Sequence, residues 1–266
     1  MNLEIFKDFA IKTAKSSGKI LMSFFNSKYD IKKKSAVDLV TKADIESENN
    51  IINSIKKNFP EHSIITEESD LIDCNSDFKW VIDPLDGTTN FVHSLPIFAI
   101  SIALQYKNDT ILGVVYNPAY HKCFWAIKEQ GAYQNDSKIS VSKTENLIDS
   151  LLVTGFPYNH NKSWDKSFEL FHEFYSKTQG IRRLGAASLD FCFVAMGRFE
   201  GFYEFNLKPW DVCAGDLICR EAGGKTSDWS GNDMPFSGSN IIASNNLIHK
   251  KMLKIINQKK YDIILN

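Results

Sequence analysis

The 266-residue sequence lacks several features that would assign it to a common class of protein. No apolar run approaches the roughly 18 residues of a membrane span, and charged residues interrupt the opening stretch, unlike a signal peptide. The formal net charge is only -1, so no overall field attracts nucleic acid or an acidic membrane. These absences predict a cytoplasmic protein that binds neither membranes nor nucleic acid.

The cysteines and histidines also lack the spacings that are typical of disulfide frameworks, zinc sites and covalent catalysis. The five cysteines contain no Cys-x-x-Cys pair, and their odd number argues against a disulfide framework, which fits a reducing compartment. The sequence has no His-Glu-x-x-His zinc motif, no Gly-x-Ser-x-Gly elbow and no cysteine next to a histidine. Neither a zinc site nor a covalent enzyme intermediate is therefore predicted.

The first half of the chain changes from helical to strand-like periodicity. Apolar residues recur on one helical face from Leu3 to Phe24, and a second helix over 45–59 ends before Pro60. From residue 63 the segments SIIT, WVID, FAISIALQY, TILGVVYN and CFWAIK are short, β-branched and aromatic, and turn signals separate them. They predict an antiparallel sheet.

The second half mixes both periodicities. Buried strands are predicted at SLLVTGF and NIIAS and an alternating one at FEGFYEF, between helices at 163–177, 187–196, 211–221 and 246–258. No linker rich in proline or glycine divides the chain. We therefore expect one compact body with an α+β half over 1–140, an α/β half over 141–266 and a shared cleft.

Acidic residues gather at the predicted ends of these elements. They are Asp44, Glu67, Glu68, Asp83, Asp86 and Asp211. Each aspartate taken alone fits an ordinary turn or helix cap. The stretch WVIDPLDGTTNF nevertheless carries more charge than capping needs, and no arginine lies beside it in the sequence. Carboxylate oxygens without nitrogen or sulfur donors are the ligands of Mg²⁺ or Mn²⁺.

Gly87 and Thr88 directly follow the two aspartates of that stretch. A glycine at a helix start offers free backbone N–H groups, which a phosphate binds. A divalent cation beside a phosphate cradle predicts hydrolysis of a phosphate ester, because bound cations polarise phosphoryl oxygens and lower the pKa of water.

Four segments in order, DLVTKAD, ITEES, WVIDPLDGTTNFVHSLP and KPWDVCAGDLICREAGG, closely resemble the signature segments of the inositol monophosphatase family. The resemblance runs from about residue 5 to residue 258. It implies a five-layered αβαβα sandwich with a mixed C-terminal sheet, and a homodimer. It also implies Mg²⁺-dependent, lithium-sensitive hydrolysis of myo-inositol monophosphate or a related sugar phosphate.

The resemblance assigns roles to matching residues. Two to three Mg²⁺ ions, for which Mn²⁺ could substitute, would be held by Glu67, Asp83, the carbonyl of Leu85, Asp86 and Asp211. The attacking water would be oriented and deprotonated by the catalytic residues Asp44 and Thr88, with Glu67. The small-molecule phosphate ester would contact Asp86, Gly87, Thr88, Gly185, Ala187 and Glu204.

Several alternatives remain open. Ala186 stands where many members of the family carry Ser or Thr, so a hydroxyl contact near the substrate is missing. Fructose-1,6-bisphosphatase or broad sugar phosphatase activity is one alternative. Arg182 and Arg183 could then contact a second phosphate, or could form a surface ion pair, for example with Asp190.

A regulatory binding scaffold with secondary catalysis, for example one that acts on transcription machinery, is the alternative from another class. The complete acidic set argues against loss of activity. Separately, the lysine-rich segment from Ile31 to Thr41 is predicted to be a lid over the site.

Overall fold

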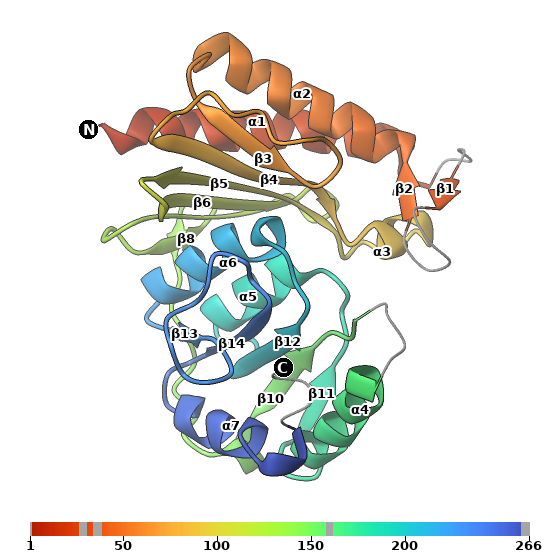
Figure 1. Ribbon diagram of the computed structural model, residues 1–266, viewed down its shortest axis with the longest axis vertical. Coiled ribbons are helices and arrows are strands. Elements are labelled where there is room, and N and C mark those ends of the chain that lie inside the picture. Colours follow the sequence, from red (N-terminus) through yellow and green to blue (C-terminus); the bar gives the residue numbers. More distant parts are fainter. Residues whose placement is uncertain (1, 27–30, 34–38, 158–161, 262–266) are drawn as a thin grey trace.

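The computed structural model describes residues 2–26, 31–33, 39–157 and 162–261, which form helices and sheets stacked in layers (Figure 1). The helices in the described part of the chain are α1 (Leu3–Phe24), α2 (Lys42–Asn58), α3 (Thr88–Val92), α4 (Lys162–Tyr175), α5 (Ala187–Ala195), α6 (Pro209–Glu221) and α7 (His249–Ile256). Short 3-10 turns lie at Leu147–Asp149 and Lys259–Tyr261.

The larger sheet has the strand order β3-β4-β5-β6-β7-β8-β9. Its strands are β3 (Ser63–Thr66), β4 (Phe78–Asp86), β5 (Ala99–Tyr106), β6 (Asp109–Asn117), β7 (Lys122–Ile127), β8 (Ala132–Gln134) and β9 (Ser137–Lys138). It is antiparallel from β4 to β9, as predicted.

The edge strand β3 departs from the predicted antiparallel arrangement because it pairs with β4 in parallel, with Thr66 beside Ile82. Residues 67–77 carry the chain back to the starting end of the sheet instead of turning in a hairpin, and only a crossover of that kind joins parallel neighbours. As a result, the carboxyl ends of β3 and β4 lie at the same edge of the sheet. Glu67 follows one strand at this edge, and Asp83 is the next residue along the other.

The smaller sheet has the order β11-β10-β12-β14-β13 and is mixed, as predicted. Its strands are β10 (Leu151–Thr154), β11 (Gly180–Arg182), β12 (Gly201–Phe205), β13 (Lys225–Ser227) and β14 (Asn240–Ser244). Strands β10, β11 and β12 run parallel, and β14 pairs antiparallel with β12 and β13.

Helices cover both faces of each sheet, which gives the five layers expected from the family resemblance (Figure 1). Successive side chains of a strand point to opposite faces. Ile102 of β5 accordingly packs in the cluster under α1 and α2, and Ala103 packs against α5 and α6. In the smaller sheet, Phe202 faces α5 and α6 and Tyr203 faces α4 and α7.

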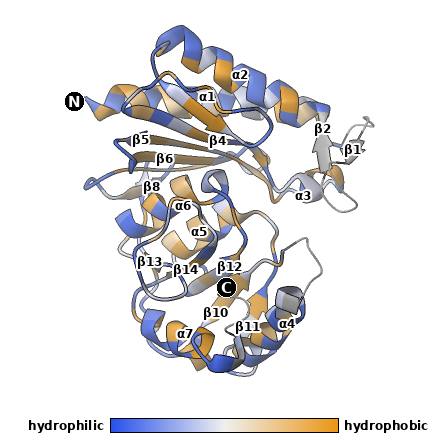
Figure 2. Cartoon of the chain, in the orientation of Figure 1, coloured by the Kyte–Doolittle hydropathy of each residue, from blue (hydrophilic) through white to orange (hydrophobic). Residues whose placement is uncertain are grey.

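The apolar residues follow these layers. Figure 2 shows hydrophobic colour concentrated in the strands and on the helix faces turned toward them. A close approach fixes the middle layer, because a Cβ on Gly113 of β6 would stand 2.6 Å from the carbonyl oxygen of Ala214 in α6. Only glycine lets α6 lie this near the sheet. The start of α6, which carries Asp211, is thereby positioned against the larger sheet.

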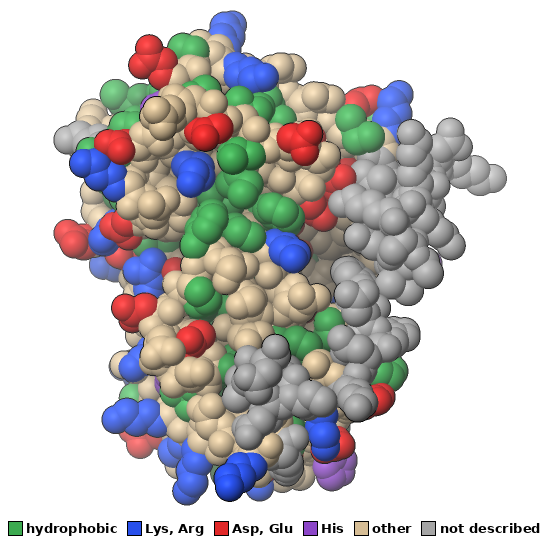
Figure 3. All heavy atoms as spheres, in the orientation of Figure 1, with side chains coloured by type: hydrophobic (Ala, Val, Ile, Leu, Met, Phe, Trp, Pro, Cys, Tyr) green, Lys and Arg blue, Asp and Glu red, His purple; other side chains and the backbone are tan. Residues whose placement is uncertain are grey.

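Two surface observations bear on the expected environment. Within the described residues, every helix is too short or too polar to cross a lipid bilayer. On the face shown in Figure 3, basic and acidic side chains are interspersed.

The predicted lid falls partly outside the described residues. Strands β1 (Ile31–Lys33) and β2 (Leu39–Thr41) pair antiparallel, but residues 34–38 are not described, and the lid remains a prediction.

A buried histidine fixes α7 to the smaller sheet. His249 is fully buried, and its ring nitrogens lie 2.9 Å from the hydroxyl oxygens of Ser227 and Ser244. Burial lowers the pKa of His249 to about 4; the charge of Lys225 acts in the same direction, and a hydrogen bond with the Lys225 backbone opposes the shift. The ring is therefore neutral in the folded protein at pH 7.

We predict that this histidine makes the fold sensitive to acid. An unfolded histidine protonates near pH 6.5, so between pH 6.5 and 4 the unfolded state binds more protons and the free energy of unfolding falls as the pH falls. Denaturant unfolding at pH 7.5 and at pH 5 gives the fall in the free energy of unfolding between the two pH values. This fall should be larger in the wild type than in His249→Gln by on the order of 1 kcal/mol. The exposed control His121→Gln should behave as the wild type. An equal loss in His249→Gln would contradict the assignment.

Candidate active site

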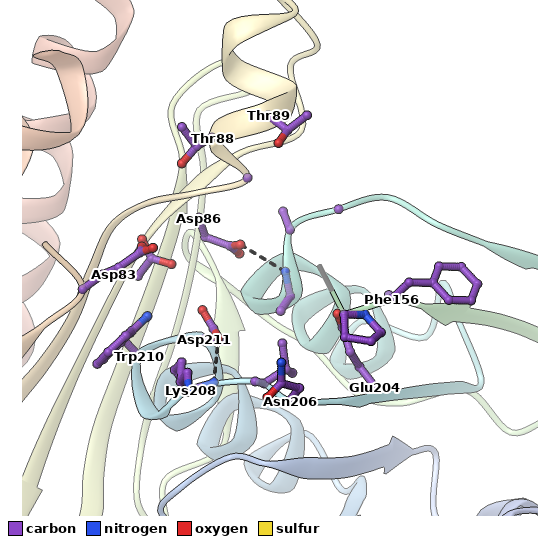
Figure 4. A pocket seen from close by; sticks show the side chains of 18 of the residues that line it. Asp83, Asp86, Thr88, Thr89, Phe156, Glu204, Asn206, Lys208, Trp210 and Asp211 are labelled. Carbon is purple, nitrogen blue, oxygen red and sulfur yellow. Dashed lines mark hydrogen bonds between the residues drawn. The ribbon is translucent and has the colours of Figure 1, made fainter. Parts of the chain in front are cut away.

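A cavity of about 520 Å³ opens where the two sheets and the middle helices meet. Its walls are the carboxyl end of β4 with the start of α3, the loop after β10, the turn before α5 and the segment from β12 to α6. Figure 4 shows Asp83, Asp86 and Asp211 beside a common space, with Thr88 on one side of it and Glu204 on another. Residues from both halves of the chain therefore line one cavity.

A bulge in β4 places two of these aspartates on the same face. Asp83 pairs with Ser101 and Asp86 with Ala99, so three steps along β4 match two steps along β5. In a regular strand, residues three apart point to opposite faces. The extra residue cancels that alternation, and Pro84 within the bulge has no N–H to leave unpaired. The sequence Asp-Pro-x-Asp thus aims both carboxylates at the cavity.

The acidic side chains here repel one another. Asp83 is buried and accepts a hydrogen bond of 2.9 Å from the Leu85 N–H. Burial raises its pKa well above the usual range, and the charges of Glu67, Asp86 and Asp211 raise it further. Burial likewise raises the pKa of Asp211, followed by the charges of Asp86 and Glu67. These carboxylates are close enough to oppose one another's ionisation.

Asp86 joins β4 to α5 in the other half of the chain. Its Oδ1 accepts a hydrogen bond from the Ala187 N–H at 3.2 Å, and its Oδ2 accepts from the Ser188 N–H at 2.8 Å and the Ser188 hydroxyl at 2.5 Å. Burial raises the pKa of Asp86, and the hydrogen bonds from Ser188 and Ala187 lower it. The carboxylate therefore acts as an N-terminal cap for α5.

Asp211 reaches the cavity from the first turn of α6. Pro209 begins that helix, where its missing N–H costs nothing, and Asp211 Oδ2 accepts a hydrogen bond of 2.7 Å from the Lys208 N–H. The motif Lys-Pro-Trp-Asp is thus a helix start that also presents a carboxylate to the cavity.

The Gly87–Thr88 turn supplies a place for an anion. Gly87 has φ 88°, a left-handed conformation that favours glycine, and α3 begins at Thr88. Among the described residues, none accepts a hydrogen bond from the N–H of Gly87 or Thr88. Thr88 Oγ1 lies 3.1 Å from both Asp44 Oδ1 and the Leu85 carbonyl oxygen. The turn therefore combines unused amides with a hydroxyl held by a buried carboxylate.

The far end of the cavity holds Glu204 and Arg183. Burial raises the pKa of Glu204 to about 8, although the charge of Arg183 opposes the shift. Behind them, Asp190 is buried, and its Oδ1 lacks a hydrogen-bond partner in the described part of the chain. The ion pair with Asp190 that the sequence suggested for Arg182 or Arg183 does not form within the described residues. Arg183 instead lines the cavity.

The donor set suits a hard divalent cation. Its side chains are carboxylates: Asp83 and Asp86 are buried, Glu67 and Asp211 are half-buried, and their charges raise the free energy of ionising their neighbours. In the described part of the chain, no three acidic, histidine or cysteine side chains already converge as a metal cluster. Each aspartate is instead hydrogen-bonded to a backbone N–H, so a cation would have to draw them together.

The cavity contains nearly all the site residues that the sequence predicted. Its lining includes Glu67, Asp83, Leu85, Asp86, Gly87, Thr88, Gly185, Ala187, Glu204 and Asp211. Asp44 lies behind Thr88 on α2, and Glu68 is not among the lining residues. The individual roles of these residues remain predictions.

Asn90 and Ser188 are contributors that the sequence reasoning missed. The Asn90 side chain donates to the Ile97 carbonyl at 2.8 Å and the Leu184 carbonyl at 2.7 Å, which ties α3 to the turn before α5. The sequence could have indicated Asn90, because this residue belongs to the segment DGTTN that begins at Asp86. The hydroxyl of Ser188 had no comparable signal, because its partner is 102 residues away in sequence.

The chain belongs to the inositol monophosphatase family, whose model matches residues 2–261. The Nus factor SuhB of Pasteurella multocida is 40% identical over 250 residues, which cover 93% of this chain and 94% of that protein. The chloroplastic phosphatase IMPL1 of Arabidopsis thaliana is 42% identical over 250 residues, covering 91% of this chain and 67% of that protein.

Solved structures agree with this assignment. The IMPase of Thermotoga maritima superposes with a TM-score of 0.89 at 35% identity, covering 97% of this chain and 98% of that one. An IMPase/NADP phosphatase complexed with Mg²⁺ and phosphate superposes with a TM-score of 0.85 at 25% identity, covering 97% of each chain. The recognised family and the layered fold are thus confirmed.

We predict that neutralising one carboxylate stabilises the metal-free protein. In Asp83→Asn the amide oxygen can still accept from Leu85, but the buried, repelled charge is gone. The free energy of unfolding at pH 7 in EDTA should rise by on the order of 1 kcal/mol. The exposed control Asp136→Asn should leave it unchanged. A less stable Asp83→Asn protein in EDTA would show that the carboxylates do not repel as described.

Proposed function

We propose that this protein is a Mg²⁺-dependent phosphomonoesterase that hydrolyses myo-inositol monophosphate or a related sugar phosphate. The observation that carries the proposal is a group of buried, mutually repelling carboxylates beside unused backbone amides in one cavity. The cation would be held by Glu67, Asp83, the Leu85 carbonyl, Asp86 and Asp211. Bound Mg²⁺ would supply charge neutralisation, polarisation of the phosphoryl oxygens and a lower pKa for water.

The chain's own groups account for the other needs of the reaction. The N–H groups of Gly87 and Thr88 would hold the phosphate, as amides at a helix start do. A water beside Thr88 would pass a proton to Thr88 Oγ1, whose own proton moves to Asp44 Oδ1, 3.1 Å away. Asp44 is buried and ionisable, so it can receive this proton without solvent. In-line displacement would then join the water oxygen to phosphorus and break the bond from phosphorus to the alcohol oxygen, which leaves as an alkoxide and takes up a proton from water, with no covalent enzyme intermediate.

The far end of the cavity would bind the alcohol part of the substrate. Asp86 and Glu204 would accept hydrogen bonds from sugar or cyclitol hydroxyls, and the backbone at Gly185 and Ala187 borders the same space. Carboxylates that face several hydroxyls suit a polyol. The IMPase/NADP phosphatase structure with Mg²⁺ and phosphate supports both the cation and the anion of this proposal.

We further propose two to three Mg²⁺ ions per site, replaceable by Mn²⁺, and lithium sensitivity, which a lithium-soaked inhibitory complex of a staphylococcal relative supports. A homodimer in the cytoplasm, without bound nucleic acid, is also proposed. The name Nus factor of the Pasteurella relative favours regulatory binding as a second candidate. The intact acidic set argues that any such role accompanies catalysis.

The experiment that tests this function is phosphate release from a panel of sugar and inositol phosphates. We expect turnover with Mg²⁺, none in excess EDTA, and inhibition by LiCl beyond that of matched KCl. No release from any ester would exclude the enzyme and favour the binding role.

We predict that two adjacent glutamates differ sharply in this assay. Glu67 lines the cavity and Glu68 does not. Glu67→Gln removes a proposed cation ligand and should lower kcat by about 100-fold or more, whereas Glu68→Gln should cost less than about tenfold. Equal losses in the two variants would mean that the cation is not held at Glu67.

A sugar bisphosphate is a second candidate substrate, and Arg183 is the observation that favours it. Its guanidinium lies over the turn beside the phosphate cradle: a Cβ on Gly185 would stand 2.2 Å from Arg183 Nη1, and one on Gly87 would stand 3.2 Å from the Gly185 carbonyl oxygen. With no ion pair among the described residues, this cation is available for a second phosphate.

We predict that Arg183→Gln lowers kcat/KM for fructose 1,6-bisphosphate by about 10- to 100-fold, the worth of a charge-assisted hydrogen bond. The value for inositol monophosphate should change by less than about threefold. Arg182→Gln is the matched control, because Arg182 is exposed on β11 outside the cavity lining. If the ratio of the kcat/KM values for the two substrates is the same in Arg183→Gln as in the wild type, the second phosphate site is excluded.

A further inference from the structure

The N-terminus of α5 is capped from the other half of the protein. Its N-cap residue, Ala186, has no side-chain oxygen, so the first amides of the helix have no local acceptor. Asp86 at the end of β4 accepts from the N–H groups of Ala187 and Ser188. A carboxylate proposed to hold a cation therefore also caps a helix.

The two oxygens of Asp86 are not bound equally. Oδ2 accepts from the Ser188 N–H at 2.8 Å and from the Ser188 hydroxyl at 2.5 Å, whereas Oδ1 accepts from the Ala187 N–H at the longer distance of 3.2 Å. Short hydrogen bonds to a carboxylate are the strong ones, and 3.2 Å is at the long end of the range. Oδ2 is therefore anchored, and Oδ1 is the oxygen that a cation can take.

The Ser188 hydroxyl has no other hydrogen bond in the described part of the chain, and the residue is fully buried. Substrate cannot reach it directly, because Ser188 is not among the residues that line the cavity. A buried hydroxyl whose single partner is a functional carboxylate can act only through that carboxylate.

We propose that Ser188 is a positioning residue that anchors Asp86 through Oδ2 and thereby presents Oδ1 to the divalent cation. The inference rests on the proposed function, because it assumes that Asp86 is a cation ligand. Groups that orient a metal ligand from behind typically change metal affinity by 10- to 100-fold when they are removed. Without the hydroxyl, Asp86 keeps two amide donors but can turn its carboxylate plane, so the ligand is no longer preorganised.

Calorimetric titration with Mg²⁺ tests this without relying on turnover. Ser188→Ala should weaken the Kd for Mg²⁺ about tenfold, and Ser188→Cys, with a similar size and a weaker donor, should fall between it and the wild type. Ser150→Ala is the matched control, because Ser150 is also fully buried and its hydroxyl donates to the Asn146 carbonyl, outside the cavity lining. This control should keep the wild-type Kd.

The outcomes separate the inference from the function on which it rests. If the wild type binds Mg²⁺ and releases phosphate but Ser188→Ala has the wild-type Kd, the positioning role is overturned and the proposed function stands. If the wild type binds no Mg²⁺, both are overturned. Circular dichroism in EDTA checks that the variants are folded. If Ser188→Ala does not fold, the Kd of Ser188→Cys decides, and a value equal to that of the wild type overturns the role.

Discussion

Repulsion among buried carboxylates is the constraint around which the centre of this protein is built. Asp83 and Asp86 are buried, Asp211 is half-buried beside them, and the charges of these carboxylates make one another harder to ionise. The fold tolerates this cost by giving each aspartate a backbone N–H, from Leu85, from the start of α5 and from Lys208. Those bonds hold the carboxylates in place but leave their charge uncompensated, and a divalent cation would supply that compensation.

One of these carboxylates, Asp86, also connects the two halves of the chain. Asp86 ends a strand of the larger sheet and caps a helix that packs on the smaller one, and Asn90 makes a second connection to the turn before that helix. The cavity therefore lies where the two halves are bonded to each other. The two halves that we propose, residues 1–140 and residues 141–266, meet at this cavity.

Much of this arrangement could be predicted from the sequence because its signals are local. Short β-branched and aromatic runs between turn signals identified most of the strands, and the Asp-Pro-x-Asp-Gly at the end of one of them predicted carboxylates that line the cavity. The parallel pairing of β3 could not be predicted from the sequence, because it depends on how residues 67–77 return across the sheet. The hydroxyl of Ser188 and the clamp of Asn90 were missed for a related reason: each acts across about 100 residues of sequence, and no periodicity reports such a contact.

Titration of the metal-free protein with Mg²⁺ near neutral pH shows most directly whether the carboxylates of Asp83, Asp86 and Asp211 bind a cation. Calorimetry in two buffers of different ionisation enthalpy reports both the binding and any protons exchanged. Because the pKa values of Asp83 and Asp211 are raised in the absence of metal, we expect saturable binding accompanied by proton release. Absence of saturable Mg²⁺ binding, or binding with proton uptake, would contradict it.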